Sequence, residues 1–534
     1  AHFDWFEYAG DDAWFRRDAP AGAARNPVLA GFYPDPSVVR VDDDYYLVNS
    51  TFAWYPGVPI FHSTDLVNWT QLGYVLDRPE LLPVAGLGVS RGVFAPTIHY
   101  HDGLFYMITT MVDAGGNFYV TAEDPAGPWS DPVWLPDIPG IDPSFFVDDD
   151  GRVYIVSNGP PADPPRYQGH NAIWIQELNL ETATIIGERK VIVDGGVDPT
   201  TNPIWVEGPH LYKLDGWYYL IAAEGGTEFF HSEVVFRSRD PFGPYEPGPN
   251  NPILTQRTLD PGRPFPVIAT GHADMVETQN GEWWAVCLGC RPYDDSFYNT
   301  GRETFLHRVS WEDGWPMSLD PSLPVTYAMD PPDLPTADAP SVPVTGNFTW
   351  RDEFESNDLA LAWNSLRGPA DDWLDFETIP GSASLTATTE TLAGSMTPAF
   401  LARRLQHATF AASTRLAVPR EPGLEAGLAV FQNETHHFYL GVRQNDDGVE
   451  VFLERAAGGE PEVIAATALD VWSDDRIELR VTASGQPYSF SVRVGEGEWI
   501  SVADDLDGSI LSTVVAGGFV GAYVGLHARR IEQA

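Results

Sequence analysis

The sequence contains almost no lysine and is short of basic residues in general. Its only lysines are Lys190 and Lys213, and 31 Lys and Arg residues stand against 76 Asp and Glu residues, a formal net charge of −45. A surface with this balance repels the phosphates of nucleic acids and the headgroups of anionic membranes. We therefore expect no nucleic acid and no membrane as a partner, whereas neutral polymers stay available as ligands.

Cysteines and long apolar runs are scarce as well. No apolar run approaches the roughly 18 residues that a membrane-spanning helix needs. The two cysteines, Cys287 and Cys290, follow an apolar stretch that reads as a strand, so buried thiols are favoured over redox or zinc chemistry. The chain begins at Ala1 without a basic and apolar leader, which is typical of a processed mature protein. A secreted or periplasmic protein is expected, with a cytoplasmic one as the alternative.

An aromatic-rich strand follows a polar turn five times in the first part of the chain. The five turns begin at Asp44, Gly103, Gly151, Gly216 and Gly281. Hardly any stretch has the 3.6-residue apolar period of a helix. Five such units, each with several short strands, predict an all-β, five-bladed β-propeller over residues 1–328. An array of β-sandwiches is the alternative, but it would not need the same turn and aromatic pattern five times.

The second part of the chain has a different composition. Residues 329–344 are rich in proline, alanine and short polar residues, which predicts a semi-rigid linker. Residues 345–534 show stretches of alternating apolar and polar residues, typical of an antiparallel β-sandwich. Two domains are also what a chain of 534 residues leads us to expect, because it is longer than one core usually serves.

Three carboxylates stand at equivalent places in three of the five units. Asp35 lies between two prolines in Phe-Tyr-Pro-Asp-Pro-Ser, Asp142 lies in a second Asp-Pro-Ser sequence, and Glu207 precedes Gly-Pro-His. Each acid comes nine residues before the turn of its unit, and the same step in the other two units leads to Phe94 and His272. The innermost strands of a propeller converge on its axis, so these acids can meet there. A turn-forming role explains one such residue but not three at matching positions.

Carboxylates that meet in this way suit the cleavage of glycosidic bonds. That reaction needs a carboxylic acid to protonate the leaving oxygen and a carboxylate on the opposite side of the sugar. A third acid nearby disfavours ionisation of the proton donor and so raises its pKa. The two flanking prolines restrict Asp35, which suits a carboxylate that must accept a proton from a fixed position.

These motifs resemble glycoside hydrolase family 43, in the β-xylosidase and α-L-arabinofuranosidase branch that carries a C-terminal β-sandwich. The resemblance rests on residues 26–37, the Asp142 motif, residues 205–212, residues 225–228, residues 271–273 and Arg-Arg-Leu-Gln-His at 403–407. It implies hydrolysis with inversion, in which Asp35 is the general base, Glu207 is the general acid, and Asp142 tunes and orients the acid. Inversion implies that acid and base lie about 6.5–9.5 Å apart, leaving room for a water.

The resemblance also implies which residues bind the sugar. Carried over by position, Phe52, Thr227 and Arg302 line the pocket. Phe94 stands where β-xylosidases of this type usually have tryptophan. The aromatic surface on which the sugar would stack therefore differs from theirs. His272 matches a histidine that in many relatives contacts a calcium ion or its water shell on the propeller axis. A structural Ca²⁺ is therefore the only cofactor implied, with water supplying most of its ligands because Ca²⁺ prefers oxygen.

Several functions compete within this interpretation. Removal of terminal β-D-xylose from xylo-oligosaccharides or xylan by an exo-acting enzyme is the first. Release of arabinose from arabinoxylan by an α-L-arabinofuranosidase is the alternative, and one pocket can support both activities. A fructan-cleaving propeller is disfavoured because the chain lacks an Asn-Asp-Pro-Asn-Gly opening. A non-catalytic carbohydrate-binding propeller is disfavoured because all three acids are present. The oligomeric state and any contribution of the sandwich to the pocket stay open.

Overall fold

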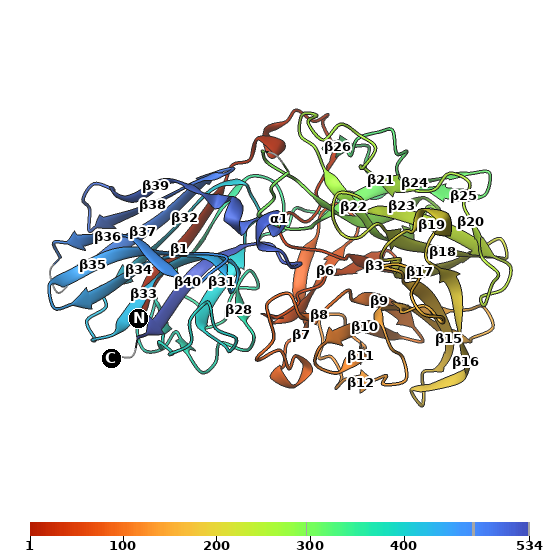
Figure 1. The fold of residues 1–534 in the computed structure, drawn as a ribbon, viewed down its shortest axis with the longest axis horizontal. Helices are drawn as coiled ribbons and strands as arrows, with labels where there is room; N and C mark the ends of the chain where they lie inside the picture. The colour runs from red at the N-terminus through yellow and green to blue at the C-terminus, as the bar shows by residue number, and fades with distance from the viewer. Residues whose placement is uncertain (295, 472–475, 532–534) are drawn as a thin grey trace.

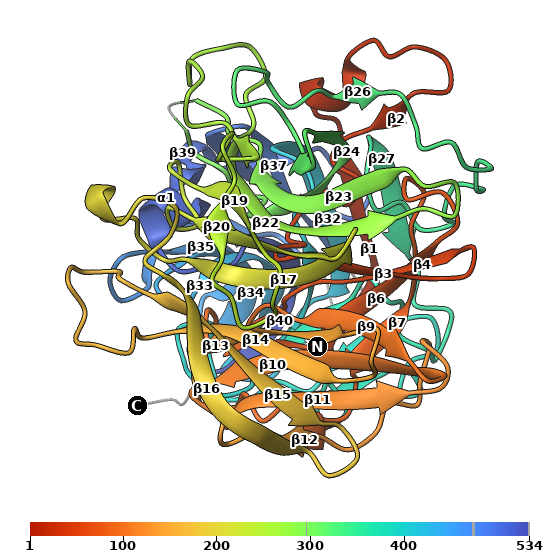
Figure 2. The same ribbon diagram turned by 90° about the vertical axis from the view of Figure 1, so that its right-hand side faces the viewer.

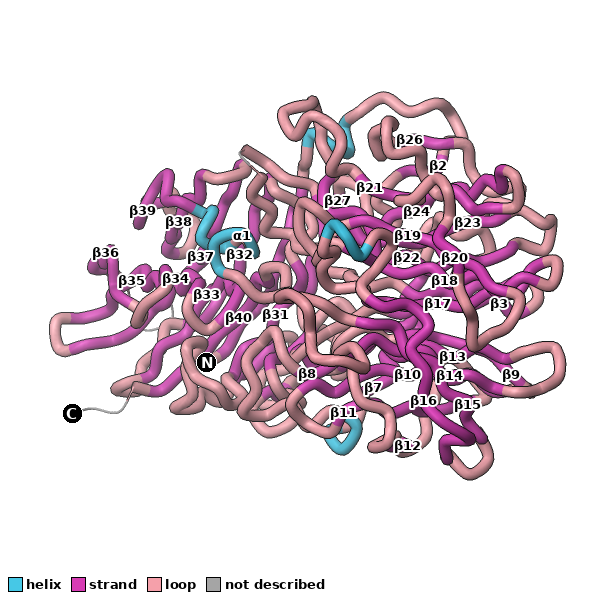
Figure 3. Tube along the Cα trace, turned by 45° about the vertical axis from the view of Figure 1, so that its right-hand side comes forward, coloured by secondary structure: helices cyan, strands magenta, loops and turns pink. Residues whose placement is uncertain are grey.

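The computed structural model describes residues 1–294, 296–471 and 476–531. Two β-rich bodies lie side by side, a sandwich at one end and a propeller at the other (Figure 1). Strands dominate both bodies, and the helical segments are single short turns (Figure 3). These turns are η1 (Ala13–Arg16), η2 (Pro79–Leu81), η3 (Pro199–Thr201), η4 (Gly508–Leu511) and α1 (Thr513–Ala516). In the described ranges no helix is long and apolar enough to cross a membrane.

Five antiparallel sheets radiate from a common axis and form the predicted five-bladed propeller (Figure 2). The strands of blades 1 and 2 are β3 (Ser37–Val41), β4 (Asp44–Val48), β6 (Gly57–Ser63) and β7 (Thr70–Leu76), then β8 (Gly92–Val93), β9 (Thr97–His101), β10 (Leu104–Val112), β11 (Gly116–Ala122) and β12 (Val133–Trp134). Blade 3 contains β13 (Ile141–Val147), β14 (Val153–Gly159), β15 (Ala172–Asn179) and β16 (Thr184–Asp194). Blades 4 and 5 contain β17 (Glu207–Leu214), β18 (Trp217–Glu224), β19 (Ser232–Ser238), β20 (Glu246–Pro247) and β21 (Leu254–Thr255), then β22 (Ile268–Glu277), β23 (Trp283–Cys290), β24 (Glu303–Glu312) and β25 (Trp315–Met317).

The innermost strands close a ring around the axis. Strand β3 contacts β9, β9 contacts β13, β13 contacts β17, β17 contacts β22, and β22 returns to β3. The aromatic-rich sequences after the predicted turns form the second strand of each blade, namely β4, β10, β14, β18 and β23. Cys287 and Cys290 lie in β23 as buried free thiols, as the sequence predicts. The ring brings the beginnings of the inner strands to one end of the axis.

Hydrogen bonds between blades hold this ring together at the residues next to the acids. The hydroxyl of Ser37, the last residue of the Asp35 motif, donates to Asp274 Oδ2 on β22 over 2.7 Å. The backbone N–H of Ile98 on β9 donates to the same hydroxyl over 3.1 Å. Ser37 therefore links three blades, which explains why serine follows the acid and proline there.

The C-terminal body is a sandwich of two eight-stranded sheets. One sheet runs β29 (Leu374–Asp375), β30 (Ala383–Leu385), β1 (His2–Gly10), β32 (Thr409–Ala417), β37 (Arg476–Ser484), β38 (Pro487–Val494) and β39 (Ile500–Asp507), with β27 (Phe348–Asp352) paired to β1. The other runs β36 (Glu462–Leu469), β35 (Gly448–Ala457), β34 (His436–Asn445), β33 (Leu424–Asn433), β40 (Tyr523–Arg530), β31 (Ala399–Arg404), β28 (Asn364–Leu366) and β5 (Trp54–Tyr55). Apolar side chains from both sheets share one core.

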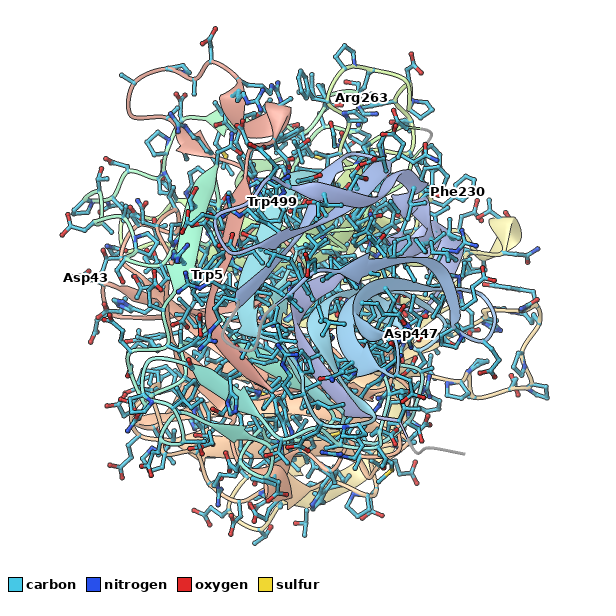
Figure 4. All side chains as sticks on the ribbon, turned by 90° about the vertical axis from the view of Figure 1, so that its left-hand side faces the viewer. Trp5, Asp43, Phe230, Arg263, Asp447 and Trp499 are labelled. Carbon is cyan, nitrogen blue, oxygen red and sulfur yellow. The ribbon has the colours of Figure 1, made fainter. Side chains whose placement is uncertain are left out.

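The N-terminal strand differs from the predicted propeller boundary of residue 1. Strand β1 lies inside a sandwich sheet, between β30 and β32, and its Phe3, Phe6 and Tyr8 are buried in the sandwich core. Trp5 on the same strand faces the sandwich end of the molecule (Figure 4). The alternating pattern of β1 buries one face against this core, so the chain starts in the sandwich and then enters the propeller. The two-stranded pair of β2 (Ala24–Arg25) and β26 (Ala328–Met329) joins the chain before blade 1 to the chain after blade 5.

Candidate active site

Irregular backbone aims the site residues at the propeller axis. Asp35, Asp142 and His272 have φ angles of 51°, 53° and 48°, in the left-handed region that non-glycine residues rarely adopt. The pairing register shifts between Ile141 and Ser144 and between Glu207 and His210. Such bulges redirect side chains that a regular strand would place on its faces. Three of the five equivalent positions predicted from the sequence thus share an unusual local conformation, and strain of this kind is typical of functional sites.

All eight residues that the sequence predicts for the site line one cavity of about 400 Å³. They are Asp35, Phe52, Phe94, Asp142, Glu207, Thr227, His272 and Arg302. The cavity volume lies in the lower part of the range usual for small-ligand pockets. The three acids therefore face a common space although the last of them, Glu207, lies 172 positions after the first, Asp35.

Asp35 is buried and held in its ionised form. Its Oδ1 accepts a hydrogen bond from Arg302 Nη1 over 2.6 Å, and its Oδ2 accepts one from the Ser50 hydroxyl over 2.5 Å. Burial alone would raise the pKa of Asp35, but the positive charge of Arg302 and the bond from Ser50 outweigh it and lower the pKa below its ordinary value. Asp35 is thus a carboxylate at neutral pH, the form that can accept a proton.

The pKa values of Asp142 and Glu207 are shifted in the opposite direction, upward. Burial and then the neighbouring charges of Asp142 and Asp35 raise the pKa of Glu207 well above its ordinary value. Burial and the charge of Asp35 also raise the pKa of Asp142. One Asp142 oxygen, Oδ2, accepts a hydrogen bond from the backbone N–H of Gly208 over 3.1 Å. Asp142 therefore acts on Glu207 in two ways, because its charge favours the protonated acid and its hydrogen bond fixes the next residue of the chain.

Arg302 connects the propeller acids to the sandwich. Besides Asp35, it donates from Nη1 to the Thr227 hydroxyl over 3.4 Å and from Nη2 to the backbone carbonyl of Phe519 over 3.2 Å. Phe519 follows α1 in the sandwich and lines the same cavity. A single guanidinium therefore orients the ionised acid, a pocket hydroxyl and a loop of the other domain.

Three phenylalanines form an apolar wall of the cavity. The Phe519 ring stacks on Phe52 with centroids 5.9 Å apart and meets Phe94 edge-on at 5.8 Å. The sequence identified Phe52 and Phe94 but missed Phe519, because a loop outside the repeated units carries no pattern that points to the axis. It also assigned no role to Trp205, which lines the cavity with its side chain 40% exposed. Its place two residues before Glu207 is the signal that would have found it.

The surroundings of His272 do not fit a calcium ion held directly by the protein. Its Nδ1 lies 3.9 Å from Asp35 Oδ1, which Arg302 already engages. Calcium takes six to eight oxygen ligands, and the described parts of the chain contain no group of three or more His, Cys, Asp or Glu residues that could hold a metal. Burial lowers the pKa of His272 to about 4, so the ring is neutral at pH 7. An ion that contacts His272 through its water shell stays a prediction.

Two family models together match most of the chain. The model of glycosyl hydrolases family 43 matches residues 24–316, and that of the beta xylosidase C-terminal Concanavalin A-like domain matches residues 351–534. A "Xylosidase/arabinosidase" of Butyrivibrio fibrisolvens is 42% identical and covers 95% of both chains. The "Non-reducing end alpha-L-arabinofuranosidase BoGH43B" of Bacteroides ovatus is 37% identical over 96% of this chain and 92% of its own. A solved "GH43_12" structure from capybara gut metagenome superimposes with a TM-score of 0.93, 39% identity and 99% coverage of both chains.

A carboxylate with a lowered pKa and an acid with a raised pKa around a cavity of about 400 Å³ are the pair that a glycoside hydrolase requires. The matched models and relatives agree with this class. The chain belongs to glycoside hydrolase family 43, with the C-terminal sandwich that accompanies β-xylosidases of the family.

Proposed function

We propose that the protein is an inverting, exo-acting glycosidase that removes terminal β-D-xylose from xylo-oligosaccharides and xylan. The observation that carries the proposal is that Asp35 and Glu207 face one cavity while their surroundings shift their pKa values in opposite directions, down for Asp35 and up for Glu207. An inverting enzyme needs this pair, a base for the water and an acid for the leaving group. Phe52, Phe94 and Phe519 bound one side of the cavity, and a cavity bounded in this way supports exo action because it favours a terminal sugar over an internal one.

The proposed reaction is a single displacement. Asp35 removes a proton from a water as the water oxygen attacks the anomeric carbon. Glu207 donates its proton to the glycosidic oxygen as the bond to the leaving group breaks. Asp142 keeps Glu207 protonated before the step and orients it through Gly208. Asp35 then loses its proton to solvent and Glu207 regains one, which returns the site to its starting state.

Release of terminal α-L-arabinofuranose is the second candidate reaction. Phe94 supports it, because this smaller ring replaces the tryptophan usual in β-xylosidases of this type. Relatives that match 95% and 96% of the chain are also named for both activities. The decisive measurement is kcat/KM on an aryl β-D-xyloside and on an aryl α-L-arabinofuranoside. Turnover of the xyloside at least as fast as that of the arabinofuranoside is expected, and a strong preference for arabinose would overturn the first assignment.

Inversion has its own test. NMR of the first-formed product is expected to show α-xylose from a β-xyloside before mutarotation, and initial β-xylose would remove the single-displacement mechanism.

We further propose that the protein meets its polymeric substrate outside the cytoplasm, which fractionation of the producing cells would check. A chelator is expected to leave the pocket acids in place and to lower the thermal midpoint only if a water-shelled ion contacts His272.

A further inference from the structure

A second cleft lies at the junction of propeller and sandwich and shares no lining residue with the candidate active site. It has a volume of about 240 Å³. Tyr33 and Gln71 line it from the propeller, residues 340–344 from the connecting segment, and Arg403 and Arg404 from the end of β31. Exposed residues of the connecting segment and Thr70 form its edge, so solutes can enter it from solvent.

The two arginines of the cleft differ from every other buried arginine in the described chain. Six arginines are buried there, and four of them pair with carboxylates. These are Arg291 with Glu303 and Asp12, Arg302 with Asp35, Arg367 with Glu434, and Arg529 with Glu425 and Glu454. Arg403 and Arg404 are each 3% exposed, and no ion pair with a described Asp or Glu involves either of them. The protein thus places two adjacent positive charges in its interior without a negative partner among the described residues.

Neutral groups accept only some of the hydrogen bonds that the guanidinium groups of Arg403 and Arg404 can donate. Arg403 lies over the rings of Tyr8 and Trp350 at 4.6 and 4.7 Å, and Arg404 lies over Tyr33 at 4.6 Å. Ring faces stabilise the planes of the guanidinium groups but leave the N–H edges in need of acceptors. Arg404 has two acceptors, because its Nε donates to the carbonyl of Phe32 and its Nη1 donates to Asn364 Oδ1, each over 2.8 Å. Arg403 Nε and Nη1 and Arg404 Nη2 are buried and have no acceptor.

The electrostatic cost of this arrangement is visible in Arg403. Its Nη2 donates to the amide oxygen of Gln406 over 2.6 Å, a neutral acceptor. Burial, together with the positive charge of Arg404, lowers the pKa of Arg403 to about 10. At Arg404 burial acts in the same direction, but the neighbouring tyrosines Tyr523, Tyr33 and Tyr74 outweigh it and raise the pKa. Two like charges in a poorly solvated region are unfavourable unless a negative charge joins them.

We propose that this cleft binds a tetrahedral oxyanion of the phosphate or sulfate class between propeller and sandwich. Such an ion offers several acceptor oxygens to paired guanidinium groups. It would supply the carboxylate-like charge that the other four buried arginines obtain from the chain. Because Tyr33 and Gln71 belong to the propeller and Arg403 to the sandwich, the bound ion would tie the two domains together.

Thermal unfolding of the full chain tests the site without any activity measurement, so its outcome is independent of the proposed function. The protein is exchanged into a buffer whose anion is bulky gluconate, and sodium phosphate, sodium sulfate or sodium chloride is added at constant ionic strength. Phosphate and sulfate are expected to raise the Tm by about 2 °C with saturation. Equal effects of all three salts, or none, would overturn the proposal.

A carboxylate introduced into the cleft by substitution tests whether the effect of phosphate on the Tm arises there. Gln71→Glu introduces one negative charge among the lining residues with almost no change of shape, and Gln444→Glu adds the same charge at an exposed position on β34. The first variant is expected to lose most of the phosphate response, and the control to keep it. An unchanged response in Gln71→Glu would refute the assignment. In crystals grown without phosphate or sulfate and soaked in selenate, an anomalous selenium peak is expected beside Arg403 and Arg404, and its absence would also refute it.

Discussion

The propeller and the sandwich contribute to the candidate active site in different ways. The propeller supplies the three acids from equivalent positions of repeated units, and the inner strands bring them together on the axis. The sandwich supplies one loop after α1, whose Phe519 closes the cavity and whose carbonyl accepts a hydrogen bond from Arg302. One domain therefore carries the reacting groups, while the other shapes the cavity and holds the arginine that keeps Asp35 ionised.

This difference shows that an accessory domain can take part in the electrostatics of a site without reacting. Residues 298–302 of the propeller dock against the sandwich, where Tyr298 N–H donates to the Ser512 hydroxyl over 2.9 Å and Ala522 N–H donates to Asn299 O over 2.8 Å. Arg302 ends this docked segment. The position of its guanidinium thus depends on both domains, and the predictions below separate what each one contributes.

The largest expected effect comes from the propeller side. Asp35→Ala removes the group that takes the proton from water, so kcat/KM on aryl xylosides is expected to fall about 10³-fold or more. The loss should be the same for good and poor leaving groups, because departure of the leaving group does not involve Asp35. Circular dichroism and the Tm of the variant serve as controls for folding. Residual turnover above a tenth of the original would remove Asp35 from the mechanism.

Glu207→Ala is the next largest change, and its effect depends on the leaving group. A leaving oxygen that would depart as a strongly basic alkoxide needs protonation, so we expect a loss of about 10²- to 10⁴-fold on xylobiose. The loss on an activated aryl xyloside should be much smaller. Equal losses on both substrates would contradict the role of general acid.

The same two acids predict the pH profile of kcat/KM. Glu207 acts only when protonated, and its pKa is raised, so activity falls as pH rises through a value well above the ordinary carboxyl range of about 4. Asp35 acts only when ionised, and its pKa is lowered, so activity falls again only at strongly acidic pH. The acid side of this profile reports on Arg302 and therefore on the sandwich.

Two neighbouring substitutions in the sandwich loop test that link. In Gly518→Ala the added Cβ would lie 2.4 Å from the Ser90 hydroxyl, at a φ of +76° that alanine rarely adopts, so the backbone at Phe519 has to move. Its carbonyl then leaves Arg302, and the acid side of the pH profile is expected to shift to higher pH. Phe519→Ala keeps the backbone and removes only the ring, so kcat/KM should fall about 10-fold with the acid side unchanged. Equal shifts in the two variants would show that the carbonyl does not hold Arg302.

The contrast between the domains also explains how far the sequence could predict this molecule. Repetition of a turn and an aromatic strand predicts the blades, and the constant step of nine residues locates Asp35, Asp142 and Glu207. Strand β1 could not be assigned, because an alternating strand does not reveal which of two sheets it joins. Phe519 and the pair Arg403 and Arg404 have roles set by contacts across a domain boundary, and no local pattern encodes those contacts.

The smallest expected effect concerns the choice between the two sugars. Phe94 meets Phe519 edge-on at 5.8 Å, and the guanidinium of Arg91 lies 5.8 Å from the centre of the Phe94 ring. Phe94→Trp extends the ring that packs against Phe52 and Phe519, so it should favour a flat pyranose over a puckered furanose. We expect the ratio of kcat/KM for xyloside over arabinofuranoside to rise, by less than about 10-fold because shape differences of this size are worth only about 1 kcal/mol. Phe230→Trp, on an exposed side chain that does not line the cavity, is the matched control. A ratio that falls in Phe94→Trp, or that changes equally in the control, would show that the wall does not discriminate between the sugars.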